Sequence, residues 1–264
     1  MVAASRRGAI EWGWFLGAAR REPDDRSDSR LATHYYADGN WAEMSESDTR
    51  LMLARYLGAI AWLDHLVGIL LDELDDLGIA DDTLVIYTSD QGWYLGEHGW
   101  YDKRWMYEES FRTPFIVRWP DRIDGGVTSD LLAQNIDLAP TLLDLAGIDP
   151  PERMHGESFA AHLRSGGRAT PEDWRDAVYY RYYESEGPHT VPKHDGIRTD
   201  RWKLIRFPEV DPDGDGPAGP GCWELYDLDA DPDELKSLAD DPAHAEIRAG
   251  LEARLEQLRL RYDA

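Results

Sequence analysis

The chain has little cysteine and no long apolar run. Cys222 is the single cysteine among 264 residues, so neither an internal disulfide nor a cysteine-rich zinc site can form. We expect this thiol to be an inert packing residue on a strand. The most apolar stretch, residues 57–71, is interrupted by Asp64 and His65. No segment therefore reaches the roughly 18 apolar residues that a transmembrane helix needs, and we expect no membrane partner.

The beginning of the chain lacks a convincing leader. Arg6 and Arg7 precede an apolar stretch at 9–19, but Glu11 lies inside that stretch. A charged residue at this place is atypical of a signal peptide. We therefore expect a soluble chain, and the sequence leaves its compartment open.

Lysine is scarce and acidic residues dominate. The sequence has 52 Asp and Glu against 28 Lys and Arg, a net charge of −24. Such a chain repels polyanions, which excludes nucleic acid and anionic membranes as main partners. The acid excess is typical of a solvated, repulsive surface, although a cation-binding surface would share it. Only four basic residues are lysines: Lys103, Lys193, Lys203 and Lys236.

Periodicity predicts an α/β region in the first part of the chain. Apolar residues recur at helical spacing from Leu53 to Leu77, and the β-branched segment 83–88 follows. A long helix that leads into such a strand is half of an α/β repeat, the unit of a parallel sheet. Residues 115–119 predict a second strand, and residues 137–146 predict another helix.

Beyond residue 160 the character of the sequence changes. Three aromatic, alternating segments, 178–183, 196–207 and 223–228, predict antiparallel strands. Residues 243–262 predict a final helix. The Asp- and Gly-rich stretch 211–221 resembles the opening of an EF-hand, but the required Glu and the flanking helices are missing. We interpret it as a hairpin loop.

The densest chemistry follows the segment 83–88. Asp90 and Gln91 come directly after this predicted strand, at the edge where α/β sheets bind ligands. Their side chains offer oxygen ligands, which suit Ca²⁺ or Mg²⁺ better than Zn²⁺. An aspartate close to a glycine after a strand is also typical of a plain turn, so both interpretations stay open at this point.

His98 and Lys103 add positive charge to the same segment. With a metal ion they describe a site for a tetrahedral oxyanion ester, in which cations neutralise the equatorial oxygens. Gly92, Gly96 and Gly99 let the backbone fold closely around a small ligand. Each charged residue could instead be an ordinary loop or surface residue, and spacing alone does not decide.

A series of short motifs follows along the chain. They are Thr88-Ser-Asp-Gln-Gly92, Leu95-Gly-Glu-His-Gly99, Lys103, Tyr107-Glu-Glu-Ser110, Arg112-Thr-Pro114, Asp137-Leu-Ala-Pro-Thr141, Gly156-Glu-Ser158, Gly196-Ile-Arg-Thr199, Lys203-Leu-Ile205 and Glu224-Leu-Tyr-Asp-Leu228. In this order the motifs resemble the C-terminal half of a type I, formylglycine-dependent sulfatase, and the resemblance covers residues 50–262. The group that they resemble most is that of the N-acetylglucosamine-6-sulfatases.

The resemblance implies a fold and a reaction. Residues 1–160 would be the C-terminal portion of an α/β/α sandwich of the alkaline-phosphatase type, and residues 161–264 an α+β subdomain with antiparallel strands. The reaction would be hydrolysis of a sulfuric ester, on a sulfated sugar or an aryl sulfate, with Ca²⁺ as the metal.

The resemblance also implies roles for individual residues. Asp90 and Gln91 would ligate Ca²⁺. Lys103 would bind the sulfate and stabilise the leaving-group oxygen, and His98 would support or line the pocket, which makes these two the candidate catalytic residues.

Three further residues are candidates for substrate binding. His194 would approach the substrate from the C-terminal subdomain, and Arg198 belongs to the neighbouring motif. Trp100, with Trp93 and Trp105, could form a stacking wall for a sugar ring. Aromatic core packing is the more frequent role of such residues, so this alternative stays open.

The nucleophile of the family is missing. Formylglycine is made from a Cys or Ser in a Cys/Ser-x-Pro/Ala-x-Arg motif, and no such motif occurs in the sequence. The early Asp-Asp metal pair of the family has no counterpart after an N-terminal strand, since Asp24-Asp25 lies in a polar stretch with no apolar strand before it. We therefore expect the chain to lack the nucleophile half of the enzyme, to be inactive alone, and to need an N-terminal half to complete its site.

Two other functions stay open. The first is hydrolysis of phosphate or phosphonate esters by a sister enzyme of the same superfamily, although Lys103 and the loop 95–99 favour sulfate. The second is a non-catalytic remnant that binds Ca²⁺ or a glycan. Paired assays on aryl sulfate and aryl phosphate distinguish the two hydrolases, and calorimetry with Ca²⁺ and a sulfated sugar tests the remnant.

Overall fold

The computed structural model describes residues 46–123, 125–184, 191–210 and 217–262. The interpretation of residues 1–20 as a poor leader lies outside these ranges, as do residues 211–216 of the hairpin loop predicted at 211–221. Residues 217–221 of that predicted loop are instead the start of a strand, Pro217–Asp227.

The described chain forms two compact units. The first comprises residues 46–90 and 113–173, and the second comprises residues 91–112 and 174–262. The second unit is therefore discontinuous in sequence, with one short early segment and one long late segment.

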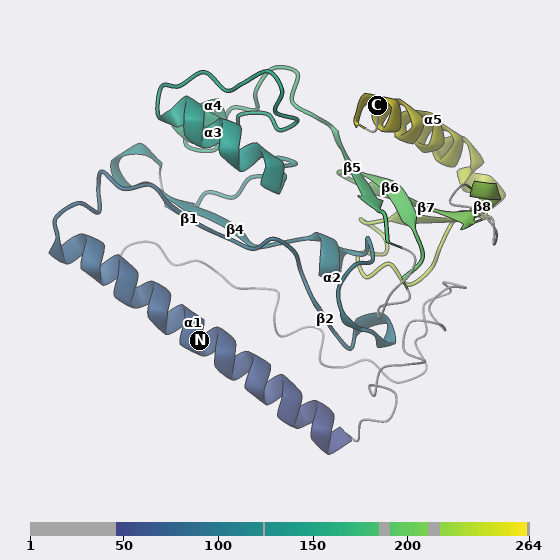
Figure 1. Cartoon of the computed structure of the whole chain (residues 1–264), viewed down its shortest axis with the longest axis horizontal. Helices are drawn as coiled ribbons and strands as arrows, with labels where there is room; N and C mark the ends of the chain where they lie inside the picture. Colours follow the sequence, from purple (N-terminus) through teal and green to yellow (C-terminus); the bar gives the residue numbers. More distant parts are fainter. Residues whose placement is uncertain (1–45, 124, 185–190, 211–216, 263–264) are drawn as a thin grey trace. The chain divides into compact units, whose positions relative to one another are not determined.

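The first unit begins with the long helix α1, Glu46–Asp76 (Figure 1). Glu46 and Arg50 lie one turn apart and form an ion pair at 2.8 Å, a spacing that favours a helix. Gly78 follows the helix with a φ of 69°, and its N–H donates to the Asp75 carbonyl at 3.0 Å. Glycine adopts this left-handed conformation without steric cost and ends helices for that reason. The predicted helix is confirmed.

No described side chain of α1 is fully buried. Leu57, Leu63 and Leu70 are 51%, 44% and 65% exposed, although a surface helix of a globular protein normally buries its apolar stripe. Despite these leucines, neither α1 nor any other described helix has the length and hydropathy of a membrane span.

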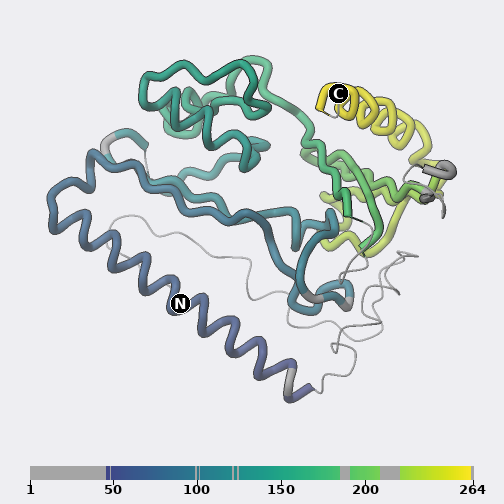
Figure 2. Tube along the Cα trace, in the orientation of Figure 1, coloured from purple at the N-terminus to yellow at the C-terminus, as the bar shows by residue number. Residues whose placement is uncertain are grey.

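The two strands of the first unit are antiparallel. Strand β1, Val85–Thr88, pairs with β4, Phe115–Arg118, and their traces run side by side in Figure 2. The register joins Thr88 to Phe115 and Val85 to Arg118. The parallel arrangement expected for β1 is wrong for this pair. A parallel neighbour needs a crossover connection, whereas residues 89–114 return the chain to the end at which β1 stops.

Short helices complete the first unit. Pro120 ends β4 and starts the 3₁₀ turn η2, Pro120–Arg122. The 3₁₀ turn η3, Asn135–Asp137, leads into α3, Leu138–Leu145, and α4 spans Ala160–Arg164. Asp137 is fully buried, and its carboxylate accepts the N–H of Gln134 at 2.7 Å and of Glu157 at 2.8 Å. The helix predicted at 137–146 is confirmed.

A four-stranded antiparallel sheet forms the frame of the second unit (Figure 1). Its strands, in the order β5-β6-β7-β8, are Ala177–Tyr182, His194–Thr199, Trp202–Val210 and Pro217–Asp227. The segment 196–207, predicted as a single strand, is in fact split between β6 and β7 by a turn at Asp200 and Arg201. Cys222 lies on β8 as predicted, but it is exposed, so the packing role assigned to it is wrong.

Each face of this sheet has its own core, because side chains alternate along a strand. Leu204 faces the helix α5, Ala245–Tyr262, and packs with Leu225, Leu251 and Leu255. Ile205 and Phe207 belong to the opposite core, which consists of Tyr94, Trp100, Trp105, Met106, Tyr107, Val191, Ile205, Phe207 and Tyr226. Five members of this second core come from residues 91–112.

Candidate functional site

Residues 91–112 contain most of the predicted site residues. Strands β2, Tyr94–Leu95, and β3, Tyr101–Asp102, form a short hairpin around the 3₁₀ turn η1, Glu97–Gly99. Helix α2, Glu108–Phe111, follows. The apolar rings of this segment fix its position on the sheet, so the polar residues between them are held in place as well.

Gly92 brings two backbone segments into close contact. Its N–H donates to the Ser110 carbonyl at 2.8 Å, and a Cβ at this position would lie 2.0 Å from the Glu109 carbonyl oxygen. The glycine was predicted to let the backbone fold around a small ligand, and in the structure its close neighbour is the chain's own backbone at Glu109 and Arg112.

We expect Gly92→Ala to destabilise the chain by about 1–3 kcal/mol, the usual cost of overpacking. The clash is with main-chain atoms, which cannot rotate away. Urea denaturation measures the change. Gly125→Ala is the comparison, since Gly125 is exposed, a Cβ there meets no atom within 4 Å, and its φ lies outside the left-handed region. If Gly92→Ala costs no more than Gly125→Ala, the close contact does not matter.

The segment 98–104, which carries Lys103 and is called the loop around Lys103 below, has a strained backbone. His98, Asp102 and Arg104 have φ values of 55°, 83° and 100°, a region in which residues other than glycine are uncommon. Such conformations cost free energy, persist only where surrounding contacts enforce them, and cluster at functional sites. Lys103 lies between two of these three residues.

Lys103 is half-buried, and its ammonium lies 5.6 Å from the centre of the Trp93 ring. No carboxylate of the described residues pairs with it, in contrast to Lys203, which has two carboxylates within 3 Å. An ammonium without an internal counter-ion is able to bind an external anion.

His98 is covered on all sides. Its side chain has no exposed surface, and its Nε2 lies 3.3 Å from the Glu109 carboxylate. Its ring stacks on Tyr107 at a centroid distance of 4.7 Å. This environment supports a role in holding the loop rather than a direct contact with substrate.

Trp100 lies in the core of the second unit. It is 1% exposed, and its ring stacks on Trp105 at 4.6 Å and meets Tyr94 edge-on at 5.6 Å. Core packing, the alternative that the sequence left open, is the role that this burial supports.

His194 is 2% exposed, on β6, among the rings of Trp105, Tyr180, Tyr182 and Phe207. Burial lowers the pKa of His194 to about 4, although its Nδ1 hydrogen bond to Pro192 acts in the opposite direction. The ring is therefore neutral at pH 7. This histidine packs against the segment that carries Lys103.

Asp90 and Gln91 lie where the chain passes from the first unit to the second. The Asp90 side chain is exposed, its carboxylate is 3.4 Å from the Ser89 hydroxyl, and its main-chain carbonyl accepts a hydrogen bond from Asn135 at 2.9 Å. Ca²⁺ takes six to eight oxygen ligands, and within the described ranges no three His, Cys, Asp or Glu side chains gather to hold a metal. The donor types fit calcium, but these two residues supply only part of a shell.

A buried network of charges was missed by the sequence reasoning. The Nζ of Lys203 lies 2.8 Å from Glu108 and 2.7 Å from Glu234, and both Lys203 and Glu234 have no exposed side-chain surface. Glu234 also accepts the main-chain N–H of Glu108 at 2.6 Å, and Arg198 reaches Glu108 at 3.6 Å. Arg198, predicted to bind substrate, is thus part of this network, which anchors the start of α2.

The two carboxylates of this network have opposite pKa shifts. Burial raises the pKa of Glu234 to about 7, more than the nearby Lys203 charge lowers it. Burial also acts on Glu108, but the charges of Lys203 and Arg198 outweigh it and lower the pKa of Glu108 below its usual value.

We expect Glu234 to make stability depend on pH. The pKa of Glu234 is higher in the folded protein than its usual value. The shifted carboxyl group therefore contributes its full share to the free energy of unfolding below about pH 4.5. This share is lost as pH rises to 7, at a rate of at most about 1.4 kcal/mol per pH unit. His194 makes the free energy of unfolding rise with pH below pH 6.5, so we compare wild type with Glu234→Gln, in which His194 is unchanged. Glu234→Gln should be less stable than wild type at pH 5, and this difference in the free energy of unfolding should shrink by pH 7.

Urea denaturation at pH 5, 6, 7 and 8 measures this difference. Glu246→Gln is the control, because Glu246 is an exposed carboxylate on α5. Parallel stability curves for wild type and Glu234→Gln would contradict the shift of the Glu234 pKa.

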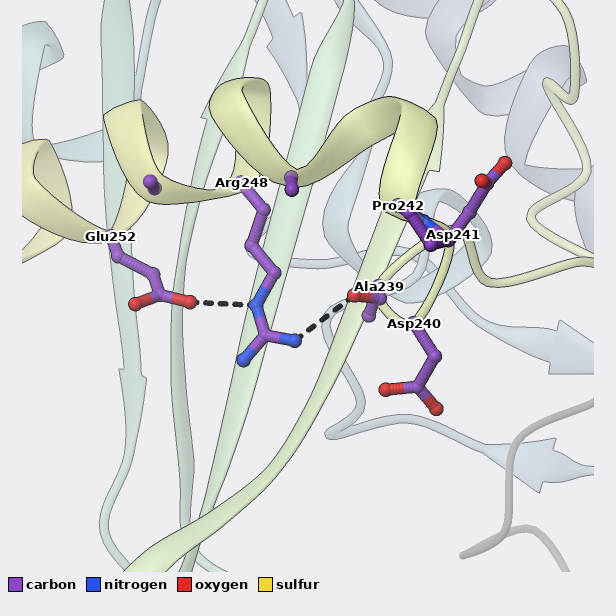
Figure 3. A pocket seen from close by; sticks show the side chains of 8 residues that line it. Ala239, Asp240, Asp241, Pro242, Arg248 and Glu252 are labelled. Atoms are coloured by element: carbon purple, nitrogen blue, oxygen red, sulfur yellow. Dashed lines mark hydrogen bonds and ion pairs between the residues drawn. The ribbon is translucent and has the colours of Figure 1, made fainter.

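A surface hollow of the second unit lies at the start of α5 (Figure 3). Arg248 crosses it and donates to Glu252 at 2.6 Å and to the Ala239 carbonyl at 3.0 Å. No predicted site residue lines it, and its arginine is already paired. Its lining consists of Ala239, Asp240, Asp241, Pro242, Ala245, Arg248, Ala249 and Glu252.

Two family models match the chain. The model described as N-sulphoglucosamine sulphohydrolase, C-terminal, matches residues 96–261, and the model described as sulfatase matches residues 24–148. The two matches overlap at residues 96–148, a range that includes His98, Trp100 and Lys103.

Individual relatives agree with these models. An N-acetylglucosamine-6-O-sulfatase of Bacteroides thetaiotaomicron is 42% identical over 208 residues, which are 78% of this chain and 35% of the relative. A multifunctional alkaline phosphatase superfamily protein of Trinickia caryophylli is 30% identical over 223 residues, 80% of this chain and 41% of the relative. The chain thus spans about two fifths or less of the length of these relatives.

Solved structures show the same fold. One, a complex with its substrate D-glucosamine-2-N,6-O-disulfate, has a TM-score of 0.72 at 42% identity over 79% of this chain and 40% of that chain. The phosphonate monoester hydrolase of Agrobacterium radiobacter has a TM-score of 0.68 at 27% identity over 82% of this chain and 43% of that chain.

Proposed function

Since this chain belongs to the sulfatase family, we propose that the protein hydrolyses sulfuric esters of sugars and that this chain forms one side of the sulfate site. The observation that carries the proposal is Lys103, a cation with no counter-ion in the part of the chain that the structure describes, held in a strained loop within the region that both family models match. The relative whose structure holds a disulfated glucosamine favours a sulfated amino sugar as substrate.

The roles follow from what each residue can reach. Lys103 binds the sulfate oxygens and stabilises the negative charge that develops on the leaving oxygen. His98 and His194 hold the loop around Lys103 from two sides, through Glu109 and through the packed rings near Trp105. Trp100 belongs to the core that carries the loop.

A metal and a nucleophile complete the proposal. Asp90 and Gln91 would hold Ca²⁺ through oxygen atoms, and the metal would neutralise the sulfate oxygens. The nucleophile would be a formylglycine, for which these 264 residues contain no motif. The division of the chain into a catalytic portion, 1–160, and an antiparallel subdomain, 161–264, is proposed with it.

The test uses two proteins. The complete reading frame that encodes the chain is expected to release sulfate from glucosamine 6-sulfate faster than phosphate from an aryl phosphate. The 264 residues alone are expected to release none, because they contain no nucleophile motif. Sulfate release by these 264 residues, or the absence of any Cys/Ser-x-Pro/Ala-x-Arg motif in the complete frame, would contradict the proposal.

A second candidate function is hydrolysis of phosphonate monoesters, which the structural likeness to the Agrobacterium enzyme favours. The same metal and Lys103 would serve a phosphonate oxyanion. Phosphonate turnover without sulfate release by the complete frame would establish this alternative in place of the sulfatase.

A further inference from the structure

The backbone of Arg104, the residue after Lys103, is held on both sides by side-chain hydrogen bonds. The N–H of Arg104 donates to the hydroxyl of Ser110 at 3.1 Å, and the carbonyl of Arg104 accepts the hydroxyl of Tyr180 at 2.9 Å. Arg104 has a φ of 100°, which a residue with a Cβ adopts only when its surroundings enforce it. These two hydrogen bonds are contacts of the required kind.

The Tyr180 hydroxyl is well placed for this task. Its ring meets Phe111 edge-on at 5.4 Å and lies 5.5 Å from the ring of His194, which restricts its orientation. Burial raises the pKa of Tyr180 above its usual value, so the hydroxyl keeps its proton and remains a donor. The residue thus reaches from β5 of the sheet to the loop, 76 positions earlier in the sequence.

We propose that Tyr180 is a positioning residue, whose hydroxyl holds the Arg104 carbonyl and thereby sets the direction in which Lys103 presents its ammonium. This inference rests on the proposed function only for the consequence in catalysis. The mechanical part, that Tyr180 restrains Lys103, stands on the contacts alone.

The chain offers a matched control. Tyr182 lies two residues further along β5, on the same face, and its ring also packs on His194, at 5.4 Å. Its hydroxyl donates to Glu184 at 3.0 Å instead of to the loop. Tyr180→Phe and Tyr182→Phe therefore remove the same atom from similar surroundings, and only the first removes the restraint on Arg104.

The first measurement needs no activity. The 264-residue chain is treated with N-hydroxysuccinimidyl acetate, and acetylation of each lysine is followed by mass spectrometry. The exposed Lys236, far from the loop in sequence, is the internal reference. We expect Tyr180→Phe to raise the labelling rate of Lys103 relative to Lys236 about fivefold, as the loss of one hydrogen bond allows. Tyr182→Phe should leave the ratio unchanged, and an unchanged ratio in Tyr180→Phe would overturn the proposal.

The second measurement uses the complete reading frame with a sulfated glucosamine. Tyr180→Phe should lower kcat/KM about fivefold in the presence of Lys103 and have no effect in a Lys103→Ala background, because its action passes through that lysine. Equal effects in both backgrounds would show a general structural role and overturn the inference. If Lys103→Ala keeps full turnover, the proposed function of Lys103 fails, while the labelling result still decides whether Tyr180 restrains it.

Discussion

Lys103→Ala is expected to lower kcat/KM of the complete reading frame for a sulfated sugar by about 10²–10³-fold, the usual loss on removal of one oxyanion donor. The ammonium has no counter-ion among the described residues, so its charge is available to a sulfate. It contributes little to folding, because its one ring contact, with Trp93, is worth about 0.5–1 kcal/mol at such a site.

Steady-state kinetics and urea denaturation together check this result. Lys236→Ala is the control, since it removes the same charge from an exposed position in the second unit. It should leave kcat/KM within about twofold, in line with the small effect of most surface substitutions. A Lys103→Ala enzyme with normal kinetics would remove Lys103 from the sulfate site. A variant that unfolds would contradict the small contribution of Lys103 to folding.

Lys203→Met is expected to cause the largest loss of stability, about 3–5 kcal/mol, because it leaves buried carboxylates without their cation. The two carboxylates lie within 3 Å of the ammonium, and Glu234 has no exposed side-chain surface. Loss of that size is a large part of the 5–15 kcal/mol that holds a typical domain together.

Urea denaturation of the 264-residue chain measures the change, with Lys236→Met as the exposed control. Adding Glu234→Gln to Lys203→Met should restore part of the lost stability, since it removes one of the unpaired charges. Equal unfolding free energies for wild type and Lys203→Met would mean that the network contributes nothing. A double variant that is less stable than Lys203→Met would show that unpaired charge is not the cause of the loss.

Regular elements were predictable because their signals are local. The helices at Glu46–Asp76 and Ala245–Tyr262 follow an apolar spacing of three and four residues, and the antiparallel sheet follows alternation and turns. The direction of β1 relative to its partner was predicted wrongly, as parallel instead of antiparallel. This direction depends on the path of residues 89–114, which the periodicity of a strand does not predict.

The site was predictable in its residues and less so in their roles. Lys103 was identified because lysine is scarce and a glycine-rich loop precedes it. Lys203 is another of the four lysines, and its position in the apolar run Trp202-Lys-Leu-Ile205 indicates a buried charge. Its partner Glu234 is one of 52 acidic residues and could not be singled out by sequence. The burial of Trp100 depends on Trp105 and Tyr94, whose contact forms only in the folded loop.

The discontinuity of the second unit has a consequence for synthesis of the protein. The hydrogen bond from Tyr107 to Glu224 joins residues 117 positions apart. Residues 91–112 leave the ribosome well before the strands β7 and β8, whose side chains complete their core. The loop that presents Lys103 therefore acquires its final conformation late, after most of the chain has been translated. During that interval its aromatic side chains are available to chaperones, and a pause in translation before β8 would prolong it.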